Sequence, residues 1–216
     1  METVLEPHLD WRDIILGSSI YGEKINDAYS RRFKLDKHSS VADVEGICGR
    51  EVVEGYYLFA LVRHPVDRIC SLYNFISLIV LGWAKRQKVD PCDLRTHITA
   101  KTMEEFPALK WPASRAFVAS TDFSEFIRNP VLMDDKAFHS QVSRLTRKGG
   151  SDIAGDAFRL EDRAQWLALL HRRLGFEFQL PHANKSTPIM TRSGLSSIDQ
   201  AFIEEEFQED MARFGY

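Results

Sequence analysis

The sequence predicts an α/β fold in which helices flank a parallel sheet, and three observations support this prediction. Residues 56–62, YYLFALV, form a continuous apolar run of β-forming residues, which is typical of a strand buried on both faces. A long apolar helix follows at once, with Pro65 in its first turn, where proline is tolerated. A second short strand over 157–160 leads into an amphipathic helix. With 216 residues and 44% hydrophobic composition, the chain is expected to fold as one domain, residues 1–216.

The other elements are predicted from caps, stop signals and apolar periodicity. Ser40 is the expected N-cap and Gly49 the C-cap of a short helix between them, and the helix that begins at Pro65 is expected to run to about Trp83. Residues 17–22 are predicted to form a loop, and the polar, proline-containing stretch 84–115 an irregular insertion or lid. Further helices are predicted within 2–6, 121–130, 136–147, 161–174 and 196–214.

The composition argues against several classes of function. The formal net charge of −3 gives no global electrostatic reason to bind nucleic acid. Cys48, Cys70 and Cys92 are widely spaced and form no CxxC pair, so the sequence predicts reduced thiols and neither a metal site nor disulfides. The N-terminus is polar and acidic, unlike a signal peptide, and the most apolar stretch, 69–83, is too short to span a bilayer. A cytoplasmic protein without a membrane segment is therefore expected.

An arginine, Arg63, stands at the predicted carboxyl end of the first strand, where open α/β sheets bind ligands. Its planar fork of donors suits a phosphate, and the start of the following helix favours an anion. Ser71, about two turns into that helix, could contact such an anion along the helix flank. The residues alone equally allow a strand-end salt bridge at Arg63 and a small packing residue at Ser71.

The same stretch carries a family resemblance. FALVRHPVDRICSLYNF resembles the 3′-phosphate-binding segment of sulfotransferases that use 3′-phosphoadenosine 5′-phosphosulfate (PAPS), in the family that includes carbohydrate sulfotransferases and many bacterial relatives. The family pattern, Arg-x-Pro-x-x-Arg-x-x-Ser-x-Tyr, is matched by Arg63, Pro65, Arg68, Ser71 and Tyr73. Further blocks resemble the family in the same order along the chain, namely KHSSVADVEGICG, FRLEDRAQWLALLHRRLGF, LPHANKST and FQEDMARFGY.

The resemblance implies a P-loop-NTPase-like parallel sheet flanked by helices, and a sulfotransferase that needs no metal. The sulfuryl group would pass from PAPS to a hydroxyl of a small molecule or glycan, which is expected to be a carbohydrate. Arg63, Ser71 and Arg68 would bind the nucleotide, and His38 would be the catalytic base, for which a near-neutral pKa is suitable. A loop containing Asn184, Lys185 and Ser186 would close over the nucleotide.

The residues named for these roles also have ordinary structural readings, which the sequence leaves open. Arg68 could pair with an acidic neighbour, and His38 could be a capping or surface residue. Residues 184–186 could form a polar turn before a helix.

One part of the family pattern is missing from the sequence. The phosphosulfate loop, a Pro-Lys-x-(Ala/Gly)-(Gly/Ser)-Thr type of segment, has no counterpart, and ILGSSIYGEK is at best a distant substitute for it. The opening METVLEPHLDW resembles the tail of the helix that follows this loop, so the chain is expected to be N-terminally truncated relative to the family. This leaves an alternative function, a non-catalytic sulfotransferase-like protein that binds a nucleotide or a partner.

Overall fold

The computed structural model describes residues 2–10, 13–17, 19–150, 152–179 and 187–216. These residues are mostly helical with one two-stranded parallel sheet, an α/β fold in the broad sense. The chain divides into two compact units, here called unit 1 (Met1–Val62 with Gln141–Ser186) and unit 2 (Arg63–Ser140 with Thr187–Tyr216), and each is described by itself.

The elements of unit 1 are, in chain order, α1 (Glu2–Leu5), η1 (Glu6–His8), α2 (Ile20–Phe33), α3 (Val41–Cys48), α4 (Arg50–Glu54), β1 (Phe59–Val62), α10 (Gln141–Leu145), β2 (Asp156–Arg159) and α11 (Arg163–Leu174). Those of unit 2 are all helical and are α5 (Pro65–Gln87), η2 (Pro91–Asp93), α6 (Leu94–His97), α7 (Ala100–Glu105), η3 (Pro107–Lys110), α8 (Pro112–Ala119), α9 (Phe123–Ile127), η4 (Pro130–Asp134), η5 (Lys136–Phe138), η6 (Arg192–Gly194), α12 (Ser197–Glu206) and α13 (Gln208–Phe214).

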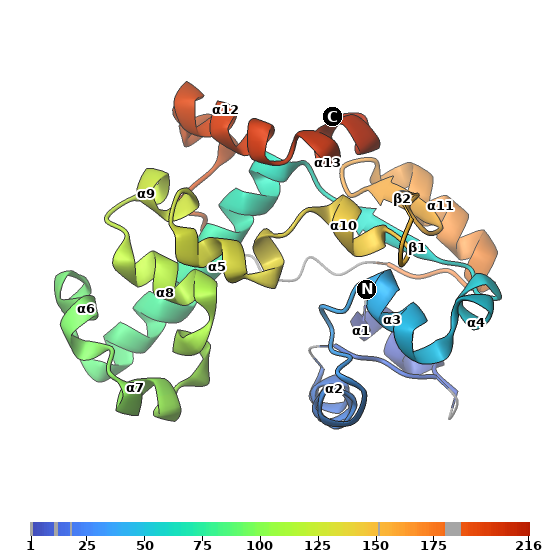
Figure 1. The fold of residues 1–216 in the computed structure, drawn as a ribbon, viewed down its shortest axis with the longest axis horizontal. Coiled ribbons are helices and arrows are strands. Elements are labelled where there is room, and N and C mark those ends of the chain that lie inside the picture. The colour runs from blue at the N-terminus through green and yellow to red at the C-terminus, as the bar shows by residue number, and fades with distance from the viewer. Residues whose placement is uncertain (1, 11–12, 18, 151, 180–186) are drawn as a thin grey trace. The chain divides into compact units, whose positions relative to one another are not determined.

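The sheet of unit 1 confirms the predicted parallel pairing. β1 and β2 lie side by side (Figure 1), in a register that pairs Phe59 with Asp156 and Val62 with Arg159. β1 is shorter than the predicted strand 56–62, and Tyr56 before it is exposed. Trp166 and Leu170 of α11 form a buried cluster against the apolar side chains of both strands, so one helix covers this small sheet.

Local signals placed several helix ends in unit 1 correctly. Ser40 caps α3 through a capping box with Asp43, and Gly49 is its C-cap, as predicted. The prediction of a loop over 17–22 was wrong in its second half, because Ser19 accepts a hydrogen bond from the backbone N–H of Gly22 (3.0 Å) and so starts α2 at Ile20. Gly22 therefore lies in a capped first helical turn, where its flexibility is compensated by the cap.

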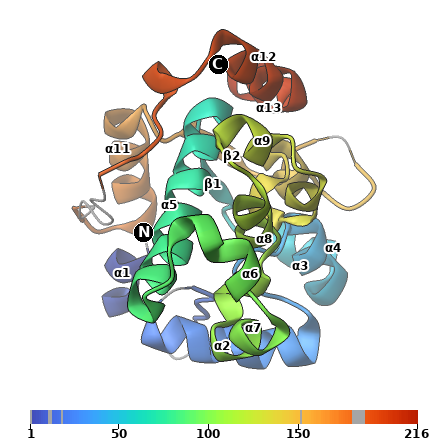
Figure 2. The ribbon, with the colours of Figure 1, turned by 90° about the vertical axis from the view of Figure 1, so that its left-hand side faces the viewer.

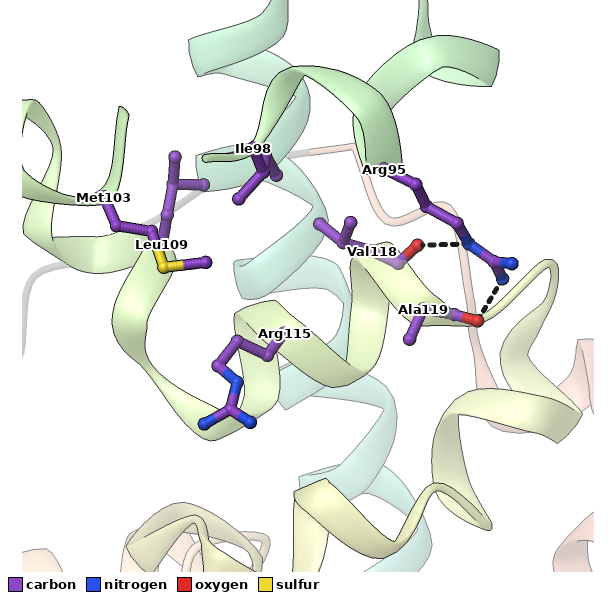
Figure 3. Close-up of a pocket in the computed structure, with 7 residues that line it drawn as sticks. All are labelled: Arg95, Ile98, Met103, Leu109, Arg115, Val118 and Ala119. Carbon is purple, nitrogen blue, oxygen red and sulfur yellow. Dashed lines mark hydrogen bonds between the residues drawn. The ribbon is translucent and has the colours of Figure 1, made fainter. Parts of the chain in front are cut away.

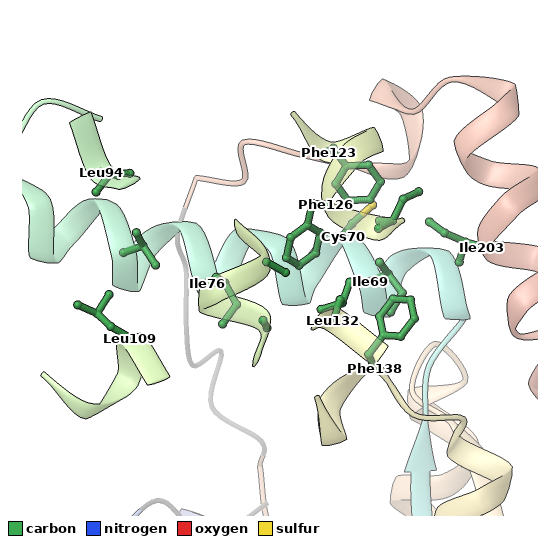
Figure 4. Packing of buried hydrophobic residues seen from close by; sticks show 14 of the residues in the cluster. Ile69, Cys70, Ile76, Leu94, Leu109, Phe123, Phe126, Leu132, Phe138 and Ile203 are labelled. Carbon is green, nitrogen blue, oxygen red and sulfur yellow. The ribbon is translucent and has the colours of Figure 1, made fainter. Parts of the chain in front are cut away.

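Helix α5 is the centre of unit 2. Its buried side chains, Ile69 and Ile76 among them, pack against apolar residues of the shorter helices around it (Figure 4). α8 and α9 lie along α5, and α12 and α13 lie at its N-terminal end (Figure 2). At 23 residues α5 is longer than predicted, and by length and composition alone it could cross a membrane. A core helix passes the same test, and its packing here is that of a core helix.

Tertiary contacts divide two segments that were each predicted as one helix. Residues 136–147 break at His139 and Ser140, which have extended or non-helical backbone between η5 and α10. Residues 196–214 break at Phe207, which is 3% exposed and packs edge-on against Phe138. The stretch 84–115, predicted to be irregular, contains short helices joined by tight turns.

Candidate functional site

The start of α5 is built by His64 and Pro65. β1 ends at Val62, and after Arg63 the buried His64 is the N-cap, its Nδ1 accepting a hydrogen bond from the backbone N–H of Val66 (3.2 Å). The His64 ring also packs against the ring of Tyr216, with centroids 5.0 Å apart. Since proline has no N–H and the Val66 N–H is already bonded, the helix end offers an anion fewer free donors than the sequence suggested.

Side chains along the helix flank are therefore the better candidates for holding an anion. Arg63 is half-buried directly after β1, and Ser71 is exposed about two turns into α5. The acidic residue of the first helical turn, Asp67, is half-buried between them in sequence. An anion that contacts Arg63 and Ser71 has to overcome the repulsion of this carboxylate.

Arg68, the second arginine of the motif, is held inside unit 2. Its Nη1 donates a hydrogen bond to the carbonyl of Ala137 (2.7 Å), and its Nη2 lies 3.7 Å from a carboxylate oxygen of Asp210. The guanidinium stacks 4.7 Å above the ring centre of Phe207. Asp210 is fully buried and accepts a hydrogen bond from the Ser140 hydroxyl (2.6 Å). The ion pair with Asp210 agrees with the structural role that the sequence allowed for Arg68, pairing with an acidic neighbour.

A clamp beside Ser71 was not foreseen from the sequence. The Asn74 side chain donates to the carbonyl of Met190 (2.7 Å) and accepts from the backbone N–H groups of Ile189 and Met190, each at 2.9 Å. These bonds attach the segment that leads into η6 to the flank of α5. An asparagine in an apolar helix was the only signal for it, and such a residue has no preferred partner in the sequence.

The thiol of Cys70 reports the charges around this part of α5. The pKa of Cys70 is raised to about 11, mainly by burial and also by the Asp67 carboxylate, while the charges of Arg63 and Arg192 lower it.

His38 belongs to unit 1 and lies on a well-anchored turn between α2 and α3. Its backbone N–H donates to Asp36 Oδ1 (2.7 Å), and its carbonyl accepts a hydrogen bond from Arg144. His38 is exposed, and the neighbouring Lys37 forms an ion pair with Glu23 (2.8 Å). The turn fixes the backbone of His38 and leaves the residue accessible, as a general base requires. The other predicted residues, Asn184, Lys185 and Ser186, lie outside the described residues.

A separate hollow of about 280 Å³ lies in unit 2 between α6, α7, η3 and α8 (Figure 3). Its wall is mainly apolar, with Met103 and Leu109 on one side and Val118 on the other. Arg95 at the rim is bonded to the carbonyls of Val118 (3.1 Å) and Ala119. Leu109 packs toward the C-terminal half of α5, whereas Cys70 lies near its start (Figure 4), so the hollow is separate from the flank that carries Ser71.

Among the described residues, no group of three or more His, Cys, Asp or Glu side chains is arranged to hold a metal ion. Comparisons of the chain with protein-family models, with curated proteins and with solved structures found no match. A functional proposal therefore rests on the sequence blocks and on the geometry of α5.

Proposed function

We propose that this protein transfers a sulfuryl group from PAPS to a hydroxyl acceptor, most simply a carbohydrate. The observation that carries the proposal is the junction of β1 and α5. A parallel strand leads into Arg63, and the following helix presents an exposed Ser71 about two turns later, in the order of the sulfotransferase pattern. The carboxyl ends of parallel strands are where α/β sheets bind ligands. We further infer a P-loop-NTPase-like fold, as the resemblance implies.

In this proposal Arg63 and Ser71 bind the 3′-phosphate of the nucleotide. The arginine supplies a planar pair of donors that matches phosphate oxygens, and the serine hydroxyl supplies a further donor. Arg68 remains a proposed nucleotide contact on the strength of the resemblance. Its contacts with Ala137 and Asp210 also hold the first turns of α5 in place. Asn184, Lys185 and Ser186 remain proposed nucleotide contacts on the strength of the resemblance.

The chemical step needs a base and a stable leaving group. His38 would accept the proton of the acceptor hydroxyl while its oxygen forms a bond to sulfur. The bond between sulfur and the bridging phosphate oxygen breaks at the same time, and 3′-phosphoadenosine 5′-phosphate leaves with the electron pair. The accessible position of His38 on an anchored turn supports this role.

A second candidate function is nucleotide binding without catalysis. The observation in its favour is that the sequence contains no segment of the phosphosulfate-loop type, which would hold the sulfuryl end of PAPS with backbone N–H groups. Both candidate functions require that Arg63 and Ser71 bind the 3′-phosphate. Only the first requires that His38 act as a catalytic base.

Calorimetric titration of 3′-phosphoadenosine 5′-phosphate into the full chain tests the shared part. Arg63→Ala should weaken binding by about 1.5–3 kcal/mol, the usual range for a hydrogen bond to a charged group, or roughly ten- to hundredfold. Arg115→Ala is the matched control, because Arg115 is an exposed arginine of unit 2 at the separate hollow. A folded wild-type chain that does not bind the nucleotide would refute both candidates.

Transfer of radiolabelled sulfate from PAPS to a panel of glycans then separates the two candidates. Labelled product that disappears in His38→Ala, with nucleotide affinity unchanged, supports the enzyme. Tight nucleotide binding with neither transfer to a hydroxyl nor hydrolysis of PAPS supports the non-catalytic alternative.

A further inference from the structure

The segment that follows Met190 is fixed against α5 next to Ser71. Asn74 makes three hydrogen bonds to the backbone of Ile189 and Met190, and η6, which begins at Arg192, contacts α5. Asn74 lies one turn after Cys70 and Ser71 on the helix, and helical side chains lean toward the N-terminus. The clamp therefore holds the η6 segment over the part of α5 that carries Ser71.

Arg192 is the cationic side chain that this clamp brings to α5. Within the part of the chain that the structure describes, its guanidinium has no hydrogen bond or ion pair, and the residue is exposed. The hydroxyls of Thr191 and Ser193 flank it and lie 3.1 Å from each other. Arg192 follows the clamped Met190 by two residues in a segment that contacts α5, and Arg63 directly precedes the N-cap of that helix. Both charges also lower the pKa of the Cys70 thiol, one residue before Ser71.

The charges at this flank indicate which ligand would fit. The donors of the first helical turn are limited by His64 and Pro65, and Asp67 adds a negative charge there. A phosphate monoester carries about 1.5 to 2 negative charges at neutral pH. One arginine offset by a neighbouring carboxylate has no net charge to set against this anion, whereas a second arginine makes the flank positive and compensates at least half of the charge of the monoester.

We propose that Arg192 is a second binding residue for a phosphate monoester on the flank of α5, acting with Arg63 and Ser71. This inference rests on the proposed function, in which the monoester is the 3′-phosphate of the nucleotide. Asn74 is a positioning residue, since it contacts the η6 segment and acts through Arg192.

The test compares two nucleotides that differ only in the 3′-phosphate. We expect Arg192→Ala to weaken binding of 3′-phosphoadenosine 5′-phosphate at least tenfold and to leave binding of adenosine 5′-monophosphate unchanged. Arg115→Ala, the exposed control arginine, should change neither. Arg192→Lys should restore part of the affinity, because the charge remains while the planar pair of donors is lost. Because Arg192 is exposed and has no partner among the described residues, its substitution should leave the melting temperature of the free protein unchanged. The melting temperature of each variant therefore checks that the variant is folded.

A second measurement separates this inference from the proposed function. Inorganic phosphate should raise the melting temperature of the wild-type chain and not that of Arg192→Ala. If the nucleotide does not bind but phosphate stabilises the protein in an Arg192-dependent way, the anion site stands and the sulfotransferase proposal fails. If Arg63→Ala abolishes nucleotide binding while Arg192→Ala behaves like Arg115→Ala, the inference fails and the proposed function stands. Failure of both phosphate and nucleotide to bind overturns both.

Discussion

Replacing Asp210 by asparagine should remove much of the stability of unit 2. Asp210 is fully buried and shares its two oxygens between the Ser140 hydroxyl (2.6 Å) and the Arg68 guanidinium (3.7 Å). Asp210→Asn keeps the size of the side chain and an oxygen that can accept from Ser140. It removes the negative charge, so the guanidinium of Arg68, whose side chain is only 17% exposed, loses its acidic neighbour.

The size of the effect follows from what remains around Arg68. Breaking a buried ion pair by removing one partner costs about 3–5 kcal/mol. The carbonyl of Ala137 and the ring of Phe207 still interact with the guanidinium, which places Asp210→Asn at the lower end, about 3 kcal/mol. Asp210→Ala also removes the hydrogen bond from the Ser140 hydroxyl and should cost about 1 kcal/mol more.

Urea denaturation followed by circular dichroism measures these differences as shifts of the unfolding midpoint. The double variant Arg68→Met, Asp210→Leu removes both charges and should recover most of the stability, because apolar residues of similar volume often replace a buried pair without loss. An Asp210→Asn protein within about 1 kcal/mol of wild type would refute the reasoning, since removing the Asp210 charge from beside Arg68 would then have almost no cost.

Three further outcomes are expected. Gly155→Ala should destabilise the protein by at least about 2 kcal/mol in the same urea assay, because φ is +73° and a Cβ atom would lie 2.1 Å from the carbonyl oxygen of Leu58; unchanged stability would contradict this. The Cys70 thiol, buried and with a pKa of about 11, should resist a thiol reagent near pH 8 until the chain unfolds, whereas the two exposed cysteines react at once. Burial raises the pKa of Asp199, but hydrogen bonds from Arg128 and two serines outweigh burial and lower the pKa below its ordinary value. As the pH falls, Asp199 is therefore protonated in the unfolded chain before it is protonated in the folded one, and the stability that its charge contributes is lost. Asp199→Asn should lose this acid-dependent contribution, and identical acid titrations of the two proteins would exclude it.

The parts of the fold that the sequence predicted correctly depend on neighbours in the chain. The strand before Val62, the proline at the start of α5 and the capping box of Ser40 all arise from short-range sterics and hydrogen bonds. The same reasoning failed where distant residues decide. The break at Phe207 occurs where its ring is buried against Phe138, and no local signal marks it.

In the candidate site too, some residues could be identified from their neighbours in the chain and others only from distant contacts. Arg63 and Ser71 stand out because strand, helix and spacing are local, and the resemblance adds their proposed roles. Asn74 and its partner Met190 are separated by 116 residues in the sequence, so their contact becomes visible only in the folded chain. Arg192 has no periodicity or motif to distinguish it from other exposed arginines.

Two of the family-like sequence blocks meet at the start of α5, and their contacts suggest separate tasks for the arginines of the motif. The C-terminal block contributes Asp210, which lies against Arg68, and Tyr216, which packs against the cap residue His64. Both contacts fix the first turns of α5 from the core side. Ser71, close to Arg68 on the same helix, is exposed. If the proposed function is correct, a substitution in the C-terminal block should weaken nucleotide binding through the orientation of α5, and the loss should follow the loss of stability. Substitution of the exposed Arg192 should weaken binding without destabilising the fold, because this residue would act on the ligand directly.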